Sequence, residues 1–192
     1  MRKPLKILVA DDESIIRLGL KTMLTTLGHE VLLASNGREA LNIVRSSAPD
    51  LALLDIQMPL SDGLEAARTI AQKYPMPILI LTAYSEQDLI ERAAQLPIQG
   101  YLIKPVNERD LAAAIPVAIA RFEEAQTLAR EKAELQESLE TRKLVDRAKG
   151  KLMQNGMSEE EAYLALQRRA REGRISMRQA AEAILAQATS HP

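Results

Sequence analysis

The sequence predicts an α/β fold: a doubly wound parallel sheet of five strands, then a helical connector and a small three-helix all-α domain. Through residues 1–120, five short apolar segments alternate with helix-like segments, an order typical of a parallel sheet with helices on both faces. Residues 107–154 contain almost no turn signal, which indicates long helix. Serine-led capping sequences then begin two short helices. We expect domains at 1–120 and 141–192, joined by a connector at 121–140.

The predicted strands end in polar side chains. Leu51-Ala-Leu-Leu runs directly into Asp55, and an uninterrupted apolar run of this length indicates a strand buried on both faces. The other expected strands are residues 5–10, 30–34, 77–82 and 100–104.

Turn and cap residues set the expected helices between these strands. Gly28 closes a helix over 15–27, and Asn36 with Glu39 opens one over 36–46. Asp62-Gly63 opens a helix that ends before Pro75. A short helix from Ser85 to Pro97 and another over 107–115 complete the first domain.

Apolar residues recur at steps of four and three from Leu111 to Ala129, which runs into the connector, and this spacing is typical of a coiled-coil seam; beyond Ala129 the seam weakens. Pro116 is expected to kink or break this helix locally. Two interpretations stay open: the connector pairs with a second copy, or it packs as a solvated helix within one chain. Three short helices are expected at the C-terminal end. The first ends at Asn155-Gly156, the second begins with the capping box Ser158 to Glu161 and ends at Gly173, and the third begins with the capping box Ser176 to Gln179.

Composition excludes several classes of protein. The 192 residues are 46% hydrophobic and contain no cysteine, which excludes a disulfide framework, a thiolate metal site and a cysteine nucleophile. No apolar run approaches the roughly 18 residues that span a membrane, and no signal-peptide pattern is present. A cytoplasmic location is expected.

Five complementary side chains converge at one edge of the predicted sheet. Asp11 and Asp12 follow the first strand and Asp55 ends the third, and the doubly wound order makes these strands neighbours. Clustered carboxylates need a cation, and all-oxygen ligation suits Mg²⁺. Thr82 and Lys104 end the next two strands, supplying the hydroxyl and ammonium that phosphoryl oxygens require. Asp55 is then the expected nucleophile, forming an acyl phosphate.

These residues, with Met58-Pro59, Asp62-Gly63, Thr82-Ala83 and Lys104-Pro105, resemble the receiver domain of a two-component response regulator, a flavodoxin-like fold. The resemblance implies that a sensor histidine kinase phosphorylates Asp55. It implies direct Mg²⁺ ligation by Asp12 and Asp55, with Asp11 through water and the Gln57 carbonyl as a further ligand. It also implies phosphoryl contacts from Thr82 and Lys104, a switch role for Tyr101 and a cis Lys104-Pro105 bond.

The C-terminal segment is basic. Residues 141–192 carry 10 basic and 6 acidic side chains. Lys143, Arg147 and Lys151 recur every four residues, and a mid-helix glycine, Gly150, suggests that another helix or a phosphate approaches the backbone. Tyr163 among cations is typical of base stacking, but a solvated basic face explains it as well.

The stretch from Arg147-Ala-Lys-Gly-Lys-Leu-Met153 to Ala180-Ala-Glu-Ala-Ile184 resembles an ANTAR domain, the RNA-binding module of transcription antitermination regulators. The resemblance implies binding to RNA stem-loops in nascent transcripts. The residues that match the recognition face are Arg147, Lys149, Gly150, Lys151, Tyr163, Arg168 and Arg171.

We therefore expect a phosphorylation-controlled RNA-binding antiterminator that is not an enzyme. Two rival hypotheses are a DNA-binding transcription factor and a phosphorylation-gated protein-interaction module. Helix-turn-helix proteins place one recognition helix in the major groove, whereas the basic residues here lie on two helices. Binding that is insensitive to salt would favour a protein partner, because phosphate contacts weaken steeply with salt.

Overall fold

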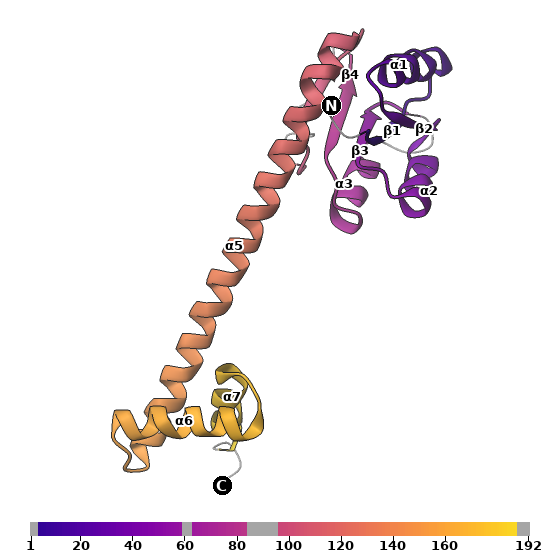
Figure 1. Cartoon of the computed structure of the whole chain (residues 1–192). Coiled ribbons are helices and arrows are strands. Elements are labelled where there is room, and N and C mark those ends of the chain that lie inside the picture. The colour runs from indigo at the N-terminus through magenta and orange to yellow at the C-terminus, as the bar shows by residue number, and fades with distance from the viewer. Residues whose placement is uncertain (1–3, 59–62, 84–95, 188–192) are drawn as a thin grey trace. The chain divides into compact units, whose positions relative to one another are not determined.

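The computed structural model describes residues 4–58, 63–83 and 96–187 (Figure 1). The chain divides into an N-terminal unit, Met1–Gln126, and a C-terminal unit, Thr127–Pro192.

The N-terminal unit contains a five-stranded parallel sheet in the order β2-β1-β3-β4-β5. This confirms the predicted doubly wound fold. The strands are β1 (Lys6–Ala10), β2 (Glu30–Ala34), β3 (Leu51–Asp55), β4 (Ile78–Thr82) and β5 (Gly100–Ile103).

Six helices are described in the two units. They are α1 (Ser14–Thr26), α2 (Gly37–Ser47), α3 (Gly63–Lys73), α5 (Glu108–Gln154), α6 (Glu159–Gly173) and α7 (Met177–Gln187). Residues 85–95 of the helix expected from Ser85 to Pro97 lie outside the described residues, as does the Asp62 cap.

The two faces of the sheet bury separate apolar clusters. Alternate strand residues point to opposite faces, so Ala52 and Leu54 pack with α2 and α3, whereas Leu51 and Leu53 pack with α1 and the start of α5. All of β3 is buried. This double burial is the physical reason for its uninterrupted apolar sequence.

The caps predicted at Asn36, Ser158 and Gly28 are present, whereas Arg174, with φ 49°, takes the left-handed cap position after α6 in place of the expected Gly173. The Asn36 side chain accepts from the Glu39 N–H at 2.9 Å. Ser158 and Glu161 form a complete capping box at the start of α6. Gly28 adopts φ 87° after α1, and the His29 N–H returns to the Leu24 carbonyl at 3.0 Å. That bond closes the helix end as a left-handed glycine cap does.

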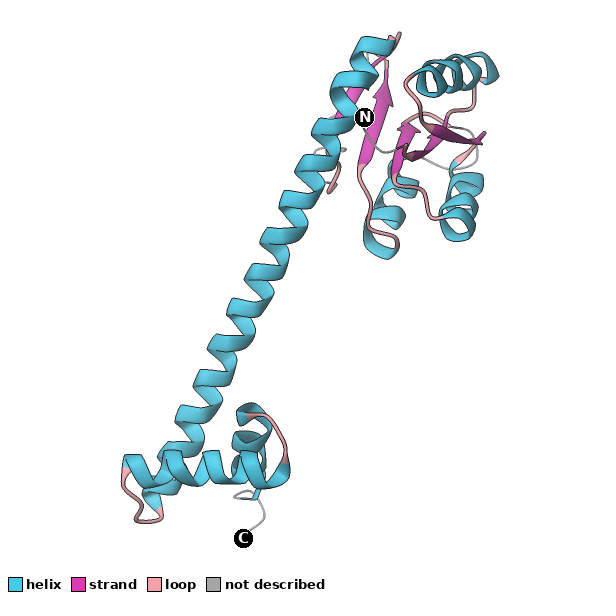
Figure 2. Cartoon of the chain, in the orientation of Figure 1, coloured by secondary structure: helices cyan, strands magenta, loops and turns pink. Residues whose placement is uncertain are grey.

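The expected break at Pro116 is wrong, because α5 continues through that residue from Glu108 to Gln154 (Figure 2). Proline removes one helical hydrogen bond. Its neighbours Leu111, Ile115 and Ala118 are buried against the sheet, and this packing holds the helix on both sides of the proline. The separate first helix expected in the C-terminal domain is the end of α5.

Candidate functional site

The acidic cluster forms where the sheet order predicts it. Ala10 pairs with Leu54 across the β1–β3 ladder, so Asp11 and Asp12 follow β1 beside Asp55 at the end of β3. Ligand oxygens of the three carboxylates all lie within 4.8 Å of one another. Asp11 and Asp55 are buried, whereas Asp12 is exposed. The cluster therefore has one side open to a ligand.

Lys104 reaches this cluster from beyond the end of β5. Its Nζ lies 2.7 Å from Asp11 Oδ2 and 2.8 Å from Asp55 Oδ2. The ammonium bridges the two buried carboxylates and supplies the cation that such a cluster needs. The Lys104-Pro105 bond is cis, as the sequence resemblance implied.

Burial dominates the electrostatics of Asp55. It raises the pKa of the carboxyl above its ordinary value, and the Asp11 charge adds to that effect, while the hydrogen bonds from Lys104 and from the Gln57 backbone N–H oppose it. Burial acts to lower the pKa of Lys104, but its hydrogen bonds to Asp11 and Asp55 outweigh this and leave that pKa raised. The ammonium therefore stays charged at neutral pH.

Arg17 and Gly63 position the cluster, and sequence reasoning gave neither a role. The Arg17 guanidinium donates to the backbone carbonyls of Asp11 and Asp12, at 2.6 and 2.8 Å. The Gly63 N–H donates to the Ile56 carbonyl at 2.9 Å, and a Cβ on Gly63 would overlap the Asp55 carbonyl oxygen. The Asp62-Gly63 pair marks a turn in sequence, but nothing in the sequence signals Arg17.

Thr82 and Tyr101 differ in exposure. Thr82 is buried at the end of β4, where its hydroxyl donates to the Ala83 carbonyl at 3.2 Å. Tyr101 lies on β5 with 55% of its surface exposed. In the structure its ring is thus on the outside of the sheet.

The oxygen donors of the acidic cluster fit Mg²⁺. Mg²⁺ takes one or two carboxylates, retains several waters and completes its coordination with phosphate oxygens. The exposed Asp12 and the buried Asp55 and Asp11 offer this set within one small space.

The C-terminal unit packs the end of α5 with α6 and α7 around Ala148, Leu166, Ala180 and Ala181. Lys143, Arg147 and Gly150 are exposed on α5, and Arg168 and Arg171 are exposed on α6. Helical residues advance by about 100°, so Gly150 lies on the side of α5 opposite the buried Ala148. We call Lys143, Arg147, Gly150 and Lys151 the α5 outer face.

Lys149 and Gly150 differ from expectation. The Lys149 ammonium contacts Glu159 at 2.7 Å and Asp146 at 3.5 Å, so it links α5 to the start of α6. A Cβ on Gly150 would meet nothing within 4 Å among the described residues. No helix among the described residues therefore approaches Gly150, and both an external phosphate and a helix of another molecule stay open as interpretations.

Tyr163 lies in a different place from the α5 outer face. It lines a hollow of about 520 Å³ with Glu134, Glu137, Val145 and other residues of the same unit. Val145 and Arg147 are two residues apart and therefore lie on nearly opposite sides of α5. The structure therefore separates two groups of residues that the sequence analysis assigned to one recognition face.

Each of the two units matches the model of a known protein family. Residues 7–116 match the Response regulator receiver domain, and residues 133–185 match the ANTAR domain. The chain is a response regulator with an ANTAR domain. The chain is also 44% identical over 184 residues to the transcriptional regulatory protein PdtaR of Mycobacterium tuberculosis, covering 95% of this chain and 90% of that protein.

Other relatives match the receiver alone. A probable transcriptional regulator, ycf27 of Porphyra purpurea, is 40% identical over 64% of this response regulator and 50% of its own length. The structure of a response regulator receiver domain protein from Clostridium thermocellum has a TM-score of 0.58 and 38% identity, covering 62% of this chain and 97% of that one. The receiver domain of a modulated diguanylate cyclase from Desulfovibrio desulfuricans gives 0.60 and 31%, covering 63% and 98%.

These findings place the response regulator in two-component signalling and transcription regulation. Receiver and ANTAR domains are regulatory. Among the described residues, no helix has the length and apolarity needed to cross a membrane.

Proposed function

We propose that this response regulator is a phosphorylation-controlled antiterminator that binds RNA stem-loops in nascent transcripts. The observation that carries the proposal is the bridge from Lys104 to Asp11 and Asp55, present in the same chain as an exposed basic helical face. The first arrangement can accept and hold a phosphoryl group, and the second offers cations to an RNA backbone.

In the proposed transfer, a carboxylate oxygen of Asp55 attacks the phosphorus of a phosphohistidine on a sensor histidine kinase. The new O–P bond forms as the P–N bond breaks, and the electron pair stays on the imidazole nitrogen. Lys104 already lies 2.8 Å from Asp55, so its ammonium can follow the phosphoryl oxygens and stabilise their charge.

Asp11, Asp12, Asp55 and the Gln57 carbonyl would hold Mg²⁺. The bound ion would neutralise charge on the phosphoryl oxygens. The Gln57 N–H that hydrogen bonds to Asp55 helps to fix the carboxylate for attack.

The proposed switch uses Thr82 and Tyr101. Phosphoryl oxygens on Asp55 would draw the Thr82 hydroxyl from the Ala83 carbonyl, and Tyr101 would turn inward from its exposed position. Phosphorylation can shift this equilibrium only through its different affinity for the two states. The contact of phosphate with Thr82 provides that difference.

The connector is the proposed dimerisation element. Residues 123–140 of α5 are exposed throughout, including Leu128, Leu135 and Leu139 at 58%, 66% and 59%. Most helical stability in proteins comes from packing of an apolar face, so burying Leu128, Leu135 and Leu139 against the same segment of a second copy would stabilise this helix. We propose that phosphorylation promotes that homodimer and thereby raises RNA affinity.

The α5 outer face, with Arg168 and Arg171 of α6, would bind the RNA. Arg147, Lys143 and Lys151 would contact phosphates, and Gly150 would let the RNA backbone approach the helix. Tyr163 would stack a base only if the RNA also enters its separate hollow. Lys149 would hold α6 in place through Glu159.

The test is a filter-binding titration of the full chain against an RNA stem-loop and a DNA duplex of matched length, over a salt series. Each is run with and without Mg²⁺ and beryllium trifluoride as the phosphoryl mimic. RNA binding that strengthens with the mimic and weakens with salt is expected. Preference for the duplex would favour a DNA-binding regulator, and absence of nucleic-acid binding in both states would favour a protein partner.

A further inference from the structure

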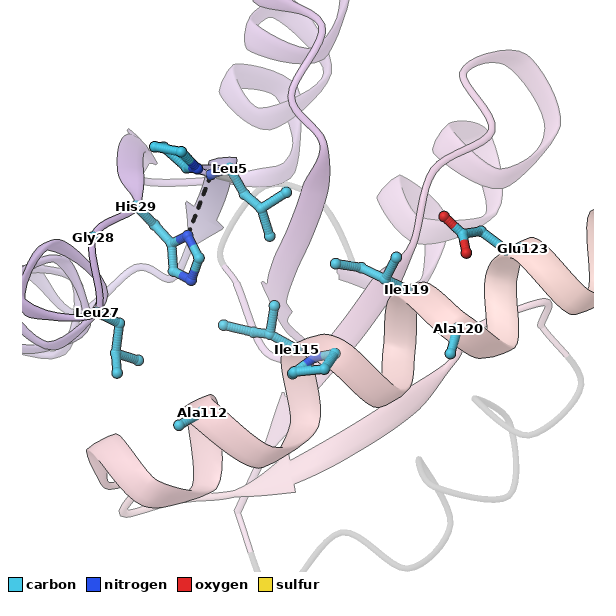
Figure 3. A pocket seen from close by; sticks show the side chains of 11 residues that line it. Leu5, Leu27, Gly28, His29, Ala112, Ile115, Ile119, Ala120 and Glu123 are labelled. Atoms are coloured by element: carbon cyan, nitrogen blue, oxygen red, sulfur yellow. Dashed lines mark hydrogen bonds between the residues drawn. The ribbon is translucent and has the colours of Figure 1, made fainter. Parts of the chain in front are cut away.

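The two ends of β1 are held in place by different contacts. Before its first residue, the Leu5 N–H donates to His29 Nδ1 at 3.3 Å, beside an apolar pocket of about 740 Å³ (Figure 3). Beyond its last residue, the chain leaves the sheet through Asp11 and Asp12, and Arg17 of α1 contacts it there. The first contact lies at the opposite end of the strand from the acidic cluster, whereas the second is made to the residues of that cluster.

Two short hydrogen bonds join the Arg17 guanidinium to the loop after β1. One nitrogen, Nη1, donates to the Asp11 carbonyl at 2.6 Å and to the Asp12 carbonyl at 2.8 Å. Hydrogen bonds from a charged donor are shorter and stronger than neutral ones. Successive carbonyls of an extended strand point in opposite directions, so two consecutive carbonyls that meet one nitrogen fix the bend at which the chain leaves the sheet.

The carboxylates of Asp11 and Asp12 are fixed by different means. Asp11 is buried, and its carboxylate lies 2.7 Å from Lys104 Nζ and accepts from the Glu13 N–H at 2.9 Å. Asp12 is exposed, and within the described part of the chain its carboxylate has no hydrogen bond or ion pair. The position of the Asp12 carboxylate therefore depends on its backbone, which Arg17 holds.

A guanidinium beside a cation site has two opposing effects. Its charge repels the ion, whereas its hydrogen bonds order the Asp12 backbone before the ion binds and so reduce the entropy lost on binding. Glu39 of α2 offsets part of the repulsion. Hydrogen bonds from the Ser35 N–H and hydroxyl, both at 2.7 Å, lower the pKa of Glu39, and the Arg17 charge adds to this effect, while burial opposes it. Because the Glu39 carboxylate is ionised and interacts with Arg17, we expect ordering to outweigh repulsion.

We propose that Arg17 is a positioning residue that raises the affinity of the acidic cluster for Mg²⁺ by holding the backbone of Asp12. This role rests on the Mg²⁺ site of the proposed function, and it gives α1 a part in ion binding. Replacing a residue that holds a metal ligand typically weakens metal binding by roughly 10–100-fold. Arg17 acts through the backbone rather than on the ligand atoms, so we expect the lower end of that range, about tenfold.

The test is a titration of the full chain with MgCl₂, followed by the backbone amide chemical shifts of the acidic cluster. The rate of phosphorylation by acetyl phosphate is then measured at limiting and at saturating Mg²⁺. Arg17→Met removes the charge and both hydrogen bonds, whereas Arg17→Lys keeps a charged donor. Lys21→Met is the matched control, because Lys21 is exposed one turn farther along α1. His29→Phe is a second control, which removes the hydrogen-bond acceptor at the opposite end of β1.

We expect Mg²⁺ affinity to fall about tenfold in Arg17→Met, to fall less in Arg17→Lys, and to stay unchanged in both controls. Saturating Mg²⁺ should restore the phosphorylation rate of Arg17→Met, because Asp55 itself is unaltered.

Three results would overturn the role of Arg17 and leave the proposed function intact. They are Mg²⁺ binding by Arg17→Met as tight as that of the wild type or tighter, a phosphorylation rate that stays low at saturating Mg²⁺, and an equal loss of affinity in His29→Phe. The last would make the loss a consequence of general destabilisation. Absence of Mg²⁺ binding to the wild type would instead overturn the proposed ion site, and the role of Arg17 with it.

Discussion

The acidic cluster of the N-terminal unit consists of buried, paired charges, whereas the α5 outer face of the C-terminal unit carries exposed cations. In a largely buried site the Lys104 ammonium lies 2.7 Å from a carboxylate oxygen of Asp11 and 2.8 Å from one of Asp55. Lys143, Arg147 and Gly150 are exposed along one helix. The first arrangement is fixed by the fold before any ligand arrives, whereas the second presents cations to a partner.

This difference has an energetic consequence. Buried charges interact strongly but incur a large desolvation cost, whereas exposed charges are screened by salt and contribute little to folding. We therefore expect substitutions in the acidic cluster to change chemistry and stability together. Substitutions on the α5 outer face should change RNA binding with little effect on folding.

The largest expected effect is the loss of phosphorylation in Asp55→Asn. The variant lacks the attacking carboxylate, so incorporation from acetyl phosphate should fall below detection on a phosphate-affinity gel. Asp50→Asn is the matched control, since Asp50 precedes the opposite end of β3 and accepts from the Lys6 N–H at 2.7 Å. Stoichiometric phosphorylation of Asp55→Asn would remove Asp55 from its proposed role.

Gly63→Ala should destabilise the N-terminal unit by roughly 1–3 kcal/mol, the usual range for overpacking a tight site. The added methyl group would overlap the Asp55 carbonyl oxygen, and the backbone must shift to relieve the overlap. Denaturant unfolding followed by circular dichroism measures the change. Unchanged stability would mean that α3 begins farther from β3 than the structure places it.

Arg147→Ala and Lys149→Ala separate RNA contact from internal pairing. Arg147→Ala should weaken binding to a stem-loop and lower the slope of log K against log salt by roughly 0.7–0.9 if one phosphate contact is lost. Lys149→Ala should change that slope less, because Glu159 and Asp146 already engage its ammonium. Equal slopes in the two variants would contradict this division, and thermal melts would check that both fold.

Gly150→Ala should have the opposite effect on stability from Gly63→Ala. Alanine favours a helix interior by about 0.8–1.0 kcal/mol over glycine, and the new methyl group meets nothing within 4 Å. Stability should therefore rise while RNA affinity falls. A more stable variant that binds RNA as well as the wild type would show that no phosphate approaches this backbone.

The smallest expected effect is on the pH dependence of stability without Mg²⁺. Because burial raises the pKa of Asp55 in the folded protein, protonated Asp55 favours folding below its ordinary pKa of 3.8. That contribution is lost as the pH rises through the raised value. Asp55→Asn should therefore melt higher than the wild type near pH 7.

The difference should shrink as the pH is lowered toward 4, where Asp55 becomes protonated in the wild type. Melting curves of the wild type, Asp55→Asn and Asp50→Asn from pH 4 to 8 measure it. A wild type that is the more stable protein at pH 7 would mean that the Lys104 ion pair outweighs the burial of Asp55.

The sequence by itself determined the doubly wound sheet and the position of the acidic cluster. β3 is buried on both faces, and such a strand must be apolar at every position up to the sheet edge, so Asp55 stands out as the first charge. Parallel order then places Asp11 and Asp12 beside it. Local chemistry also determined the caps at Asn36 and Ser158, because these depend on neighbouring residues alone.

Only the tertiary structure decided how α5 passes Pro116, where Lys149 is engaged and what surrounds Gly150. The low helix propensity of proline reflects the hydrogen bond that it removes, but it does not include the burial of Ile115 and Ala118 against the sheet. Spacing places Lys149 beside Arg147 in a basic run, but only the packing of α6 against α5 brings Glu159 to its ammonium. Contacts between residues distant in sequence depend on how the helices pack, and short-range patterns carry no record of that packing.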